Sequence, residues 1–273
     1  MYLSTEYNLF PMKSIKNTFS ITRSEKRPAL IAYLTVGHPS ITDTPSLVKA
    51  AINGGADIIE LGIPFSDPLA EGPTIQRSSA AALRLGVTPE TCLETCATLR
   101  DDGVETPIIL MGYYNPILAY GVESFITKAA RAGVNGLIIV DLPPEEGEAV
   151  KNKCTENDLD LVMLLTPTST NERIERISTQ ASGFIYCVSI TGVTGARSSL
   201  PTTLPTLVQR IRERTDLPIA IGFGISQREH IQSLAKYADG AVVGSAIIDA
   251  IDRAAPEERA NKVQEFMKTL SLQ

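Results

Sequence analysis

Two carboxylic acids, Glu60 and Glu71, lie at the two ends of one short segment, ELGIPFSDPLAE. Glu60 also belongs to an apolar run, DIIELG, in which it falls two residues after Ile58. If the run is a β-strand, alternation places Ile58 and Glu60 on one face, so that Glu60 points among apolar neighbours. Desolvation raises the pKa of a carboxyl, which suits it to give and take a proton. The segment therefore predicts acid–base chemistry by carboxylates.

A buried acid can instead be one half of a structural ion pair. None of the eight apolar runs of this chain contains Lys or Arg, so a cationic partner for Glu60 would have to come from a loop, which favours function. The same absence disfavours a Schiff-base aldolase or a pyridoxal enzyme, because both need a strand-end lysine. A metal-dependent aldolase needs clustered histidines, whereas this chain has only His38 and His230, the latter in an expected helix.

Three glycine-bearing segments predict a phosphate site. They follow the last three apolar runs and are GVTGA (192–196), GFGIS (222–226) and GSAI (244–247). Glycine lets the backbone approach an anion, and a helix that opens at Gly244 and Ser245 adds its N-terminal amides. One such segment is typical of a simple turn, but three at neighbouring strand ends match the recurrent phosphate position of eightfold α/β barrels. The Gly, Ser and Thr content of 190–203 is typical of a lid or of an ordinary surface loop.

The elements that must position these groups are eight runs rich in Val, Ile and Leu. We expect strands over 29–37, 57–65, 107–114, 136–143, 159–167, 183–190, 218–225 and 240–248. Nearly continuous hydrophobicity is typical of parallel strands covered on both faces. Between them, segments such as 46–55, 73–86, 122–133, 144–157 and 227–238 have helical spacing, with charges on one side. Eight alternations favour a closed barrel over an open doubly wound sheet, since no G-x-G-x-x-G follows the first strand.

The length of 273 residues is typical of one (β/α)8 TIM barrel, and no linker-like stretch divides the chain. We therefore expect a single domain over 1–273, with an N-terminal capping helix (12–20) across the barrel bottom and an extension over 1–11. Three helix-to-strand joints also resemble each other, namely INGGADIIELG, ARAGVNGLIIVD and KYADGAVVGS. Each has small residues where a helix would end in a left-handed cap, which we interpret as a weak internal repeat.

Composition limits the class of protein. The net charge of -6 and the lack of a Lys/Arg-rich block argue against nucleic-acid binding. The first residues lack a secretory h-region, and no apolar run is long enough to span a membrane. Cys92 and Cys96 share one helix face, but with no His or Cys nearby we interpret them as core residues and expect no metal. We expect a reduced, cytoplasmic protein.

Six motifs occur in one order along the chain: ELGIPFSDPLAEGPTIQ, GYYNP, VDLPPEE, SITGVTGAR, GFGIS and VVGSAI. With them the chain closely resembles the tryptophan synthase alpha subunit family, from about Lys13 to the last helix. The resemblance implies retro-aldol cleavage of indole-3-glycerol phosphate to indole and glyceraldehyde 3-phosphate, in the last steps of L-tryptophan biosynthesis. It also implies that indole passes through a channel to a beta subunit in an alpha2beta2 complex. Pyridoxal phosphate is expected in that partner, and no cofactor in this chain.

The resemblance assigns different roles to the two acids. Glu60 matches the catalytic glutamate, which protonates indole C3 and then removes the proton of the adjoining glycerol hydroxyl. Glu71 matches a second acid, usually aspartate, which accepts the indole N–H proton. This chain departs from the family pattern by one methylene at Glu71, and a misplacement of about 1 Å can cost roughly 100-fold in rate. The departure therefore bears on the rate more than on the type of reaction.

The other implied site residues are grouped by role. Tyr186 matches a catalytic tyrosine near the reacting glycerol carbons, although an aromatic residue of the barrel core is an alternative reading. Substrate-binding matches are Tyr33 and Tyr113 in the indole pocket, Thr194 in the lid, and the phosphate-cradle residues Gly195, Gly224, Gly244 and Ser245. Asp67 and the run NPI from Asn115 would face the beta subunit. An apolar rim of Pro116, Ile117 and Leu118 fits either such an interface or ordinary helix packing.

Three hypotheses follow. The first is an active lyase subunit in a complex with the beta chain. The second is a regulatory subunit that activates the beta chain but catalyses weakly, and Glu71 is its only motivation. The third is a free-standing lyase that releases indole. Retention of Glu60, Tyr186 and Thr194 favours the first, because a decayed site is expected to lose several such residues.

Overall fold

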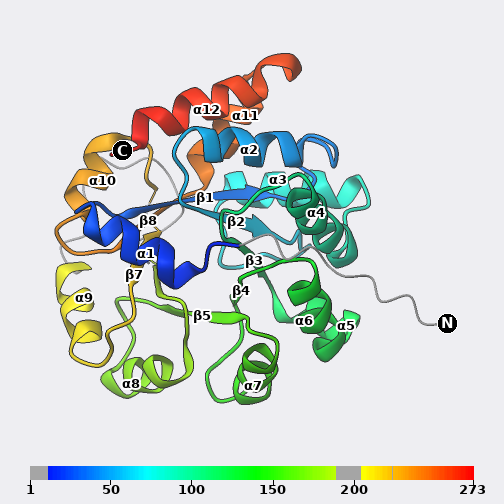
Figure 1. Cartoon of the computed structure of the whole chain (residues 1–273). Helices are drawn as coiled ribbons and strands as arrows, with labels where there is room; N and C mark the ends of the chain where they lie inside the picture. The colour runs from blue at the N-terminus through cyan, green and yellow to red at the C-terminus, as the bar shows by residue number, and fades with distance from the viewer. Residues whose placement is uncertain (1–11, 189–203, 223) are drawn as a thin grey trace.

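The computed structural model describes residues 12–188, 204–222 and 224–273. Its eight parallel strands pair in chain order and close into a barrel with helices around it (Figure 1). The strands are β1 Ala29–Thr35, β2 Ile58–Gly62, β3 Ile108–Gly112, β4 Gly136–Ile139, β5 Asp160–Leu165, β6 Ile185–Val188, β7 Ile219–Gly222 and β8 Gly240–Val243. The expected eightfold barrel is confirmed. Each strand is shorter than its apolar run, because the end of the run belongs to the following loop or helix.

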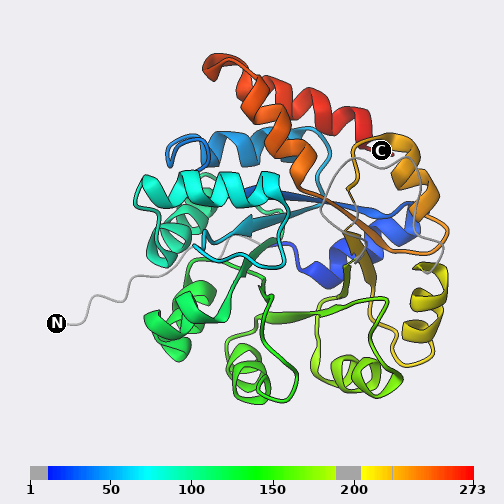
Figure 2. The same ribbon diagram turned by 180° about the vertical axis from the view of Figure 1, so that it is seen from behind.

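Helices cover the outside of the barrel (Figure 2). They are α1 Ile15–Ser24, α2 Thr44–Asn53, α3 Pro73–Arg84, α4 Pro89–Asp101, α5 Tyr114–Tyr120, α6 Val122–Arg131, α7 Glu148–Glu156, α8 Asn171–Gln180, α9 Leu204–Arg212, α10 Arg228–Leu234, α11 Ser245–Arg253 and α12 Arg259–Leu270, with a 3-10 turn η1 Pro256–Glu258. Cys92 and Cys96 are buried in α4, and His230 lies in α10, as expected. None of the helices described is both long and apolar enough to cross a membrane. The extension expected over 1–11 lies outside the described residues, so the single domain over 1–273 stays a prediction.

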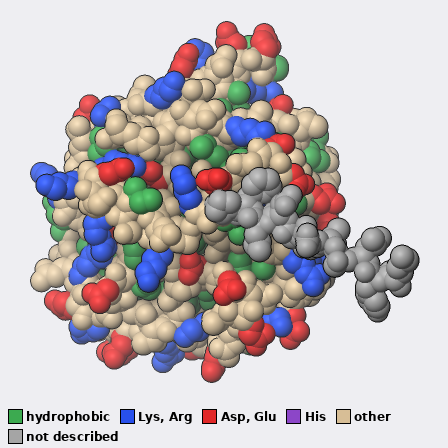
Figure 3. Space-filling view, in the orientation of Figure 1, with side chains coloured by type: hydrophobic (Ala, Val, Ile, Leu, Met, Phe, Trp, Pro, Cys, Tyr) green, Lys and Arg blue, Asp and Glu red, His purple; other side chains and the backbone are tan. Residues whose placement is uncertain are grey.

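Helix α1 closes the N-terminal end of the barrel (Figure 1). Ser14 caps it by accepting a hydrogen bond from the Asn17 amide at 3.1 Å. Ile15 and Phe19 are buried, and the Phe19 ring lies 5.5 Å from that of Phe184 inside the barrel. The expected capping helix is confirmed. On this face, acidic and basic side chains are interspersed (Figure 3).

The barrel interior has two layers that differ in chemistry. The lower layer, next to α1, is apolar and contains Ile31, Ile58, Ile109, Ile138, Val162, Phe184, Ala220 and Val242. Two residues further along each strand, alternation places an upper layer that includes Tyr33, Glu60, Tyr186 and two glycines. The polar groups therefore lie at the C-terminal ends of the strands, above the apolar lower layer.

A repeated polar tie joins neighbouring strands at the barrel bottom. Asp57, Asn135 and Asp239 each directly precede an even-numbered strand and accept the backbone N–H of the preceding odd strand at 2.8, 2.9 and 2.8 Å. Each also accepts a hydrogen bond from an arginine side chain, which is Arg27 for Asp57, Arg100 for Asn135 and Arg212 for Asp239. These are the three joints that look alike in sequence, so the repeat has a structural cause.

The left-handed caps expected at these joints occur at two of them. Gly55 has φ +104° and Gly133 has φ +77°. The third expectation is wrong, since none of residues 236–240 has positive φ. There α10 ends at Leu234, five residues before the acceptor Asp239, so the turn reaches the strand without a left-handed residue.

Replacing Asp57 by alanine should lower the free energy of unfolding by about 3 kcal/mol, because it removes the buried partner of the Arg27 guanidinium and leaves only the more exposed Glu25 carboxylate beside it. The Arg27 and Asp57 side chains are only 9% and 10% exposed. Asp102→Ala is the matched control, since Asp102 pairs with Lys49 where both side chains are more than 40% exposed. We expect that control to cost less than ~1 kcal/mol in urea unfolding. Equal losses in the two variants would contradict the role of the tie.

Candidate active site

Glu60 lies in the upper layer on β2 and is 1% exposed. It pairs in register with Tyr33 of β1 and Ile109 of β3, and the buried Ile58 lies below it on the same face, as expected. Its Oε2 atom has no hydrogen-bond partner among the described residues. Burial, and next the nearby Glu71 carboxylate, raise the pKa of Glu60 to about 8. The ligand-free protein therefore holds this carboxyl in its neutral form at pH 7.

Glu71 lies in the loop between β2 and α3 and is half-buried. Burial raises its pKa to about 7. Its backbone is fixed by α3, because its carbonyl accepts a hydrogen bond from Gln76 Nε2 at 2.9 Å. The loop is also held from the β3 side, where the Ala70 amide donates to the Tyr113 hydroxyl at 3.0 Å. These contacts fix the loop that carries Glu71, and its carboxyl titrates near neutral pH.

A mainly apolar pocket brings Glu71 together with Tyr33 and Tyr113. Its remaining lining is Ile63, Phe65, Pro68, Ile75, Ser79, Met111 and Gly112. The rings of Phe65 and Tyr113 lie 5.1 Å apart on one side of it. An aromatic-walled pocket with one acid suits a flat, apolar ligand that carries a hydrogen-bond donor.

Two tyrosines lean over glycines of the next strand. A Cβ atom at Gly62 of β2 would collide with the hydroxyl of Tyr33, and one at Gly222 of β7 would collide with that of Tyr186. Register explains the likeness, because Tyr33 pairs with Glu60 and Tyr186 with Ala220, each two residues before the glycine. Sequence reasoning missed Gly62 and assigned Gly222 only to a phosphate loop. A glycine inside a strand is the signal for such a close approach.

Tyr186 is half-buried on β6, between the apolar lower layer and the acids Glu60 and Glu71. Burial first, and then the charges of Glu60 and Glu71, raise its pKa well above the ordinary value. Its ring lies 6.4 Å from that of Phe184 in the layer below. The hydroxyl therefore stays protonated and can act as a hydrogen-bond donor. Because Tyr186 lies directly above the apolar lower layer, its interpretation as an aromatic residue of the barrel core was also reasonable.

The described part of the phosphate cradle expected from the sequence lies at the ends of β7 and β8. Gly244 is the N-cap of α11, so the helix begins at Ser245 as expected, and Gly244 packs on Tyr33. The first amides of a helix have no carbonyl partner within it, and they attract anions. Gly224 is exposed, with φ +35°. Thr194 and Gly195 lie outside the described residues, as does the whole loop expected to be a lid.

The surface beside the pocket combines polar and apolar groups. Asp67 and Asn115 are exposed, while Leu69 and Leu118 are 92% and 54% exposed. Of the two alternatives for the apolar rim, helix packing is confirmed for Ile117, which is 1% exposed because 114–120 form helix α5 and turn this side chain inward. The expectation that Ile117 faces a beta subunit as part of the NPI run is therefore wrong. No group of three His, Cys, Asp or Glu side chains in the described ranges could hold a metal ion.

Comparisons with known proteins agree with one another. A family model described as tryptophan synthase alpha chain matches residues 19–272. The chain is 48% identical over 259 residues to a tryptophan synthase alpha chain of Roseiflexus sp. (strain RS-1), covering 95% of this chain and 99% of that one. It is also 48% identical over 257 residues to a tryptophan synthase of Saccharomyces cerevisiae, covering 94% and 36%. A solved tryptophan synthase structure from Mycobacterium tuberculosis matches with TM-score 0.87 and 36% identity, covering 95% and 97%.

The buried state of Glu60 predicts a pH-dependent cost to folding. The pKa of Glu60 is about 8 in the folded protein, above the ordinary value of 4.5. Its contribution to the free energy of unfolding is therefore fully present below pH 4.5 and is lost as the pH rises to 8. At about 1.4 kcal/mol per pKa unit, Glu60→Gln should gain a few kcal/mol of stability over the wild type between pH 5 and pH 8.5. Urea unfolding at several pH values measures this gain. Glu175→Gln, at an exposed position of α8, is the control, and its stability should change with pH as that of the wild type does. The same pH dependence in Glu60→Gln as in the wild type would contradict the claim that Glu60 is buried as a neutral acid.

Proposed function

The chain belongs to the tryptophan synthase alpha chain family, and we propose that Glu60 transfers the protons of its reaction. The alpha chain is a carbon–carbon lyase that cleaves indole-3-glycerol phosphate to indole and glyceraldehyde 3-phosphate. It works without a cofactor in a complex with a beta subunit, which contains pyridoxal phosphate and receives the indole. The observation that supports Glu60 is its buried carboxyl at the mouth of the barrel, whose pKa is raised and whose Oε2 atom has no hydrogen-bond partner within residues 12–188, 204–222 and 224–273.

Glu60 suits both proton transfers of this cleavage. Because its pKa is about 8, it starts neutral at pH 7 and gives its proton to indole C3. The resulting carboxylate then takes the proton of the adjoining glycerol hydroxyl, whose oxygen becomes the aldehyde oxygen as the carbon–carbon bond breaks. The bonding electrons return to the indole ring. One residue thus acts first as acid and then as base.

Glu71 and Tyr186 assist this step in the proposal. Glu71 accepts the indole N–H proton, which makes C3 more basic, and returns it to the nitrogen as the carbon–carbon bond breaks. Its pKa of about 7 leaves a large fraction ionised at neutral pH. The Tyr186 hydroxyl donates a hydrogen bond near the reacting glycerol carbons. Tyr33 and Tyr113 hold the indole ring in the pocket that Glu71 also lines.

The remaining proposals concern the phosphate and the surroundings. The phosphate binds at the start of α11, on Gly244 and Ser245, together with Gly224 and Gly195, while the lid residue Thr194 contacts the acid that follows β2. The exposed Asp67, Asn115 and Leu118 face the beta subunit. We also propose a cytoplasmic location, which is supported by four free and buried cysteines.

Glu60→Gln should lower kcat for indole formation by at least ~100-fold while indole-3-glycerol phosphate still binds, because the amide keeps the shape and loses the proton. The assay follows indole and glyceraldehyde 3-phosphate with and without a beta subunit, and calorimetry measures binding. Near-normal turnover by the variant would remove Glu60 from the mechanism. A wild-type protein that forms no indole but activates the beta chain would favour the regulatory subunit, and full activity without any beta chain would favour the free-standing lyase.

Glu71→Asp should keep turnover within about 10-fold of the wild type, since the carboxylate stays and only its reach changes, whereas Glu71→Gln should lose roughly 100-fold. Steady-state kinetics of the two variants separate the effect of reach from the effect of charge. If Glu71→Gln turned over as fast as Glu71→Asp, Glu71 would not be the proton acceptor.

A further inference from the structure

Two helices start at opposite ends of the proposed substrate site. Helix α3 begins at Pro73, two residues after Glu71, and α11 begins at Ser245 in the phosphate cradle. The two helices pack against each other, and both pack against β1. The distance between Glu71 and the cradle therefore depends on how α3 sits on α11.

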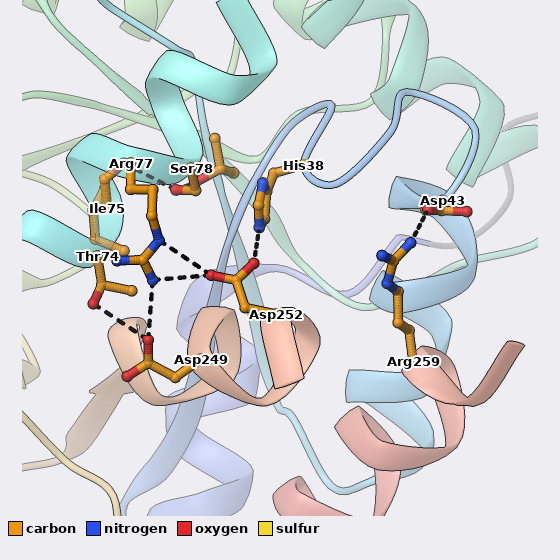
Figure 4. A network of polar contacts seen from close by, with 10 residues as sticks. His38, Asp43, Thr74, Ile75, Arg77, Ser78, Asp249, Asp252 and Arg259 are labelled. Atoms are coloured by element: carbon orange, nitrogen blue, oxygen red, sulfur yellow. Dashed lines mark hydrogen bonds and ion pairs between the residues drawn. The ribbon is translucent and has the colours of Figure 1, made fainter. Parts of the chain in front are cut away.

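One carboxylate of α11 joins the outer sides of these helices (Figure 4). Asp252 Oδ2 accepts hydrogen bonds from Arg77 of α3 at 2.9 and 3.3 Å, and Asp252 Oδ1 lies 2.8 Å from His38 Nε2. His38 belongs to the loop after β1 and is buried, with 7% exposed. Arg77 also reaches Asp249 Oδ1 at 3.3 Å, and Thr74 donates to that oxygen at the same distance. Asp252 thus connects α3, α11 and the β1 loop at once.

The partners of Asp252 stabilise its charged form. Burial opposes ionisation of Asp252, but hydrogen bonds from Arg77 and His38 outweigh it and lower the pKa of Asp252. Arg77 is 53% exposed, so its ion pairs should contribute little to the overall stability. The cluster therefore fixes geometry more than it stabilises the fold.

A second tie fixes the inner side of α3. Ser78 Oγ donates to the Ile75 carbonyl at 2.9 Å and lies 2.7 Å from Thr35 Oγ1 of β1. Thr35 lies in turn 3.4 Å from the Tyr33 hydroxyl in the pocket. These hydrogen bonds fix the inner side of α3 on β1. The position of α3 relative to α11 is then set by the contacts of Asp252 on the outer side.

We propose that Asp252 is a positioning residue, which through Arg77 and His38 sets the span between Glu71 and the phosphate-binding start of α11. The inference rests on the proposed function, in which the substrate is held by its phosphate at one end and by its indole N–H at the other. Loosening α3 from α11 moves Glu71 relative to a substrate whose phosphate is fixed. Displacements of about 1 Å at a reacting group can cost roughly 100-fold in rate, so even a partial shift is measurable.

The test uses the full chain with a beta subunit and measures kcat, KM for indole-3-glycerol phosphate and the midpoint of thermal unfolding. Asp252→Asn should lower kcat about 10-fold, with little change in KM or in the unfolding midpoint. Asp43→Asn is the matched control, because Asp43 also pairs with an arginine across two helices, Arg259 at 3.3 Å, but those helices do not both begin at the site (Figure 4). The control should keep wild-type kcat.

Two further variants separate positioning from a general structural effect. Arg77→Gln should lower kcat as much as Asp252→Asn, and the double variant should be no slower than either single one, because both break the same link. In a Glu71→Gln background, Asp252→Asn should have little further effect on kcat, since it acts through Glu71. Three results would overturn this inference and leave the proposed function standing. They are a wild-type kcat in Asp252→Asn, additive losses of kcat in the double variant, and an equal loss of kcat in Asp43→Asn. A wild-type protein without lyase activity would overturn both this inference and the proposed function.

Discussion

The burial of one carboxyl, with no cation paired to it in the part of the chain that the structure describes, is the constraint on which the site depends. Glu60 is in the barrel interior on β2, where the eight strands supply apolar side chains, tyrosine hydroxyls and glycines but no Lys or Arg. Water is excluded on one side by the apolar lower layer and by α1. Under these conditions the neutral acid is the stable form at pH 7, and it becomes a proton donor as soon as a basic carbon is placed beside it. An arginine in this layer would restore the ordinary pKa and remove that property.

The two ends of the barrel divide stability and chemistry between them. At the N-terminal end, the arginine-bound residues Asp57, Asn135 and Asp239 tie pairs of strands, and the Phe19 and Phe184 rings fill the centre. At the C-terminal end, Tyr33 and Tyr186 approach Gly62 and Gly222 so closely that a Cβ atom at either glycine would collide with the tyrosine hydroxyl. The hydrogen-bonded N-terminal end allows the C-terminal end to keep a carboxyl oxygen that has no hydrogen-bond partner among the residues described, beside a pocket with aromatic walls.

The sequence predicts the parts of this arrangement that depend on local pattern. Continuous apolar runs predicted all eight strands, alternation predicted the inward face of Glu60, and Gly244 marked the start of α11. Pattern was not sufficient where distant segments meet. The contacts of the two tyrosines with Gly62 and Gly222 depend on the register between strands, which one sequence does not specify. The sequence left Ile117 open between a partner interface and helix packing, and only the course of the short helix α5 decides for packing. The Asp252 contacts join residues 38, 77 and 252, which no periodicity relates.

The central claim concerns the ionisation of a single side chain, which can be measured without any substrate. Carbon-13 NMR of protein labelled at glutamate carboxyl carbons, with the Glu60 signal assigned by comparison with Glu60→Gln, gives its titration in the ligand-free protein. The account predicts a midpoint near pH 8, and a lower midpoint when Glu71 is replaced by Gln, because the Glu71 charge contributes to the raised pKa of Glu60. A Glu60 signal that titrates near pH 4.5, as an ordinary glutamate does, would contradict the account.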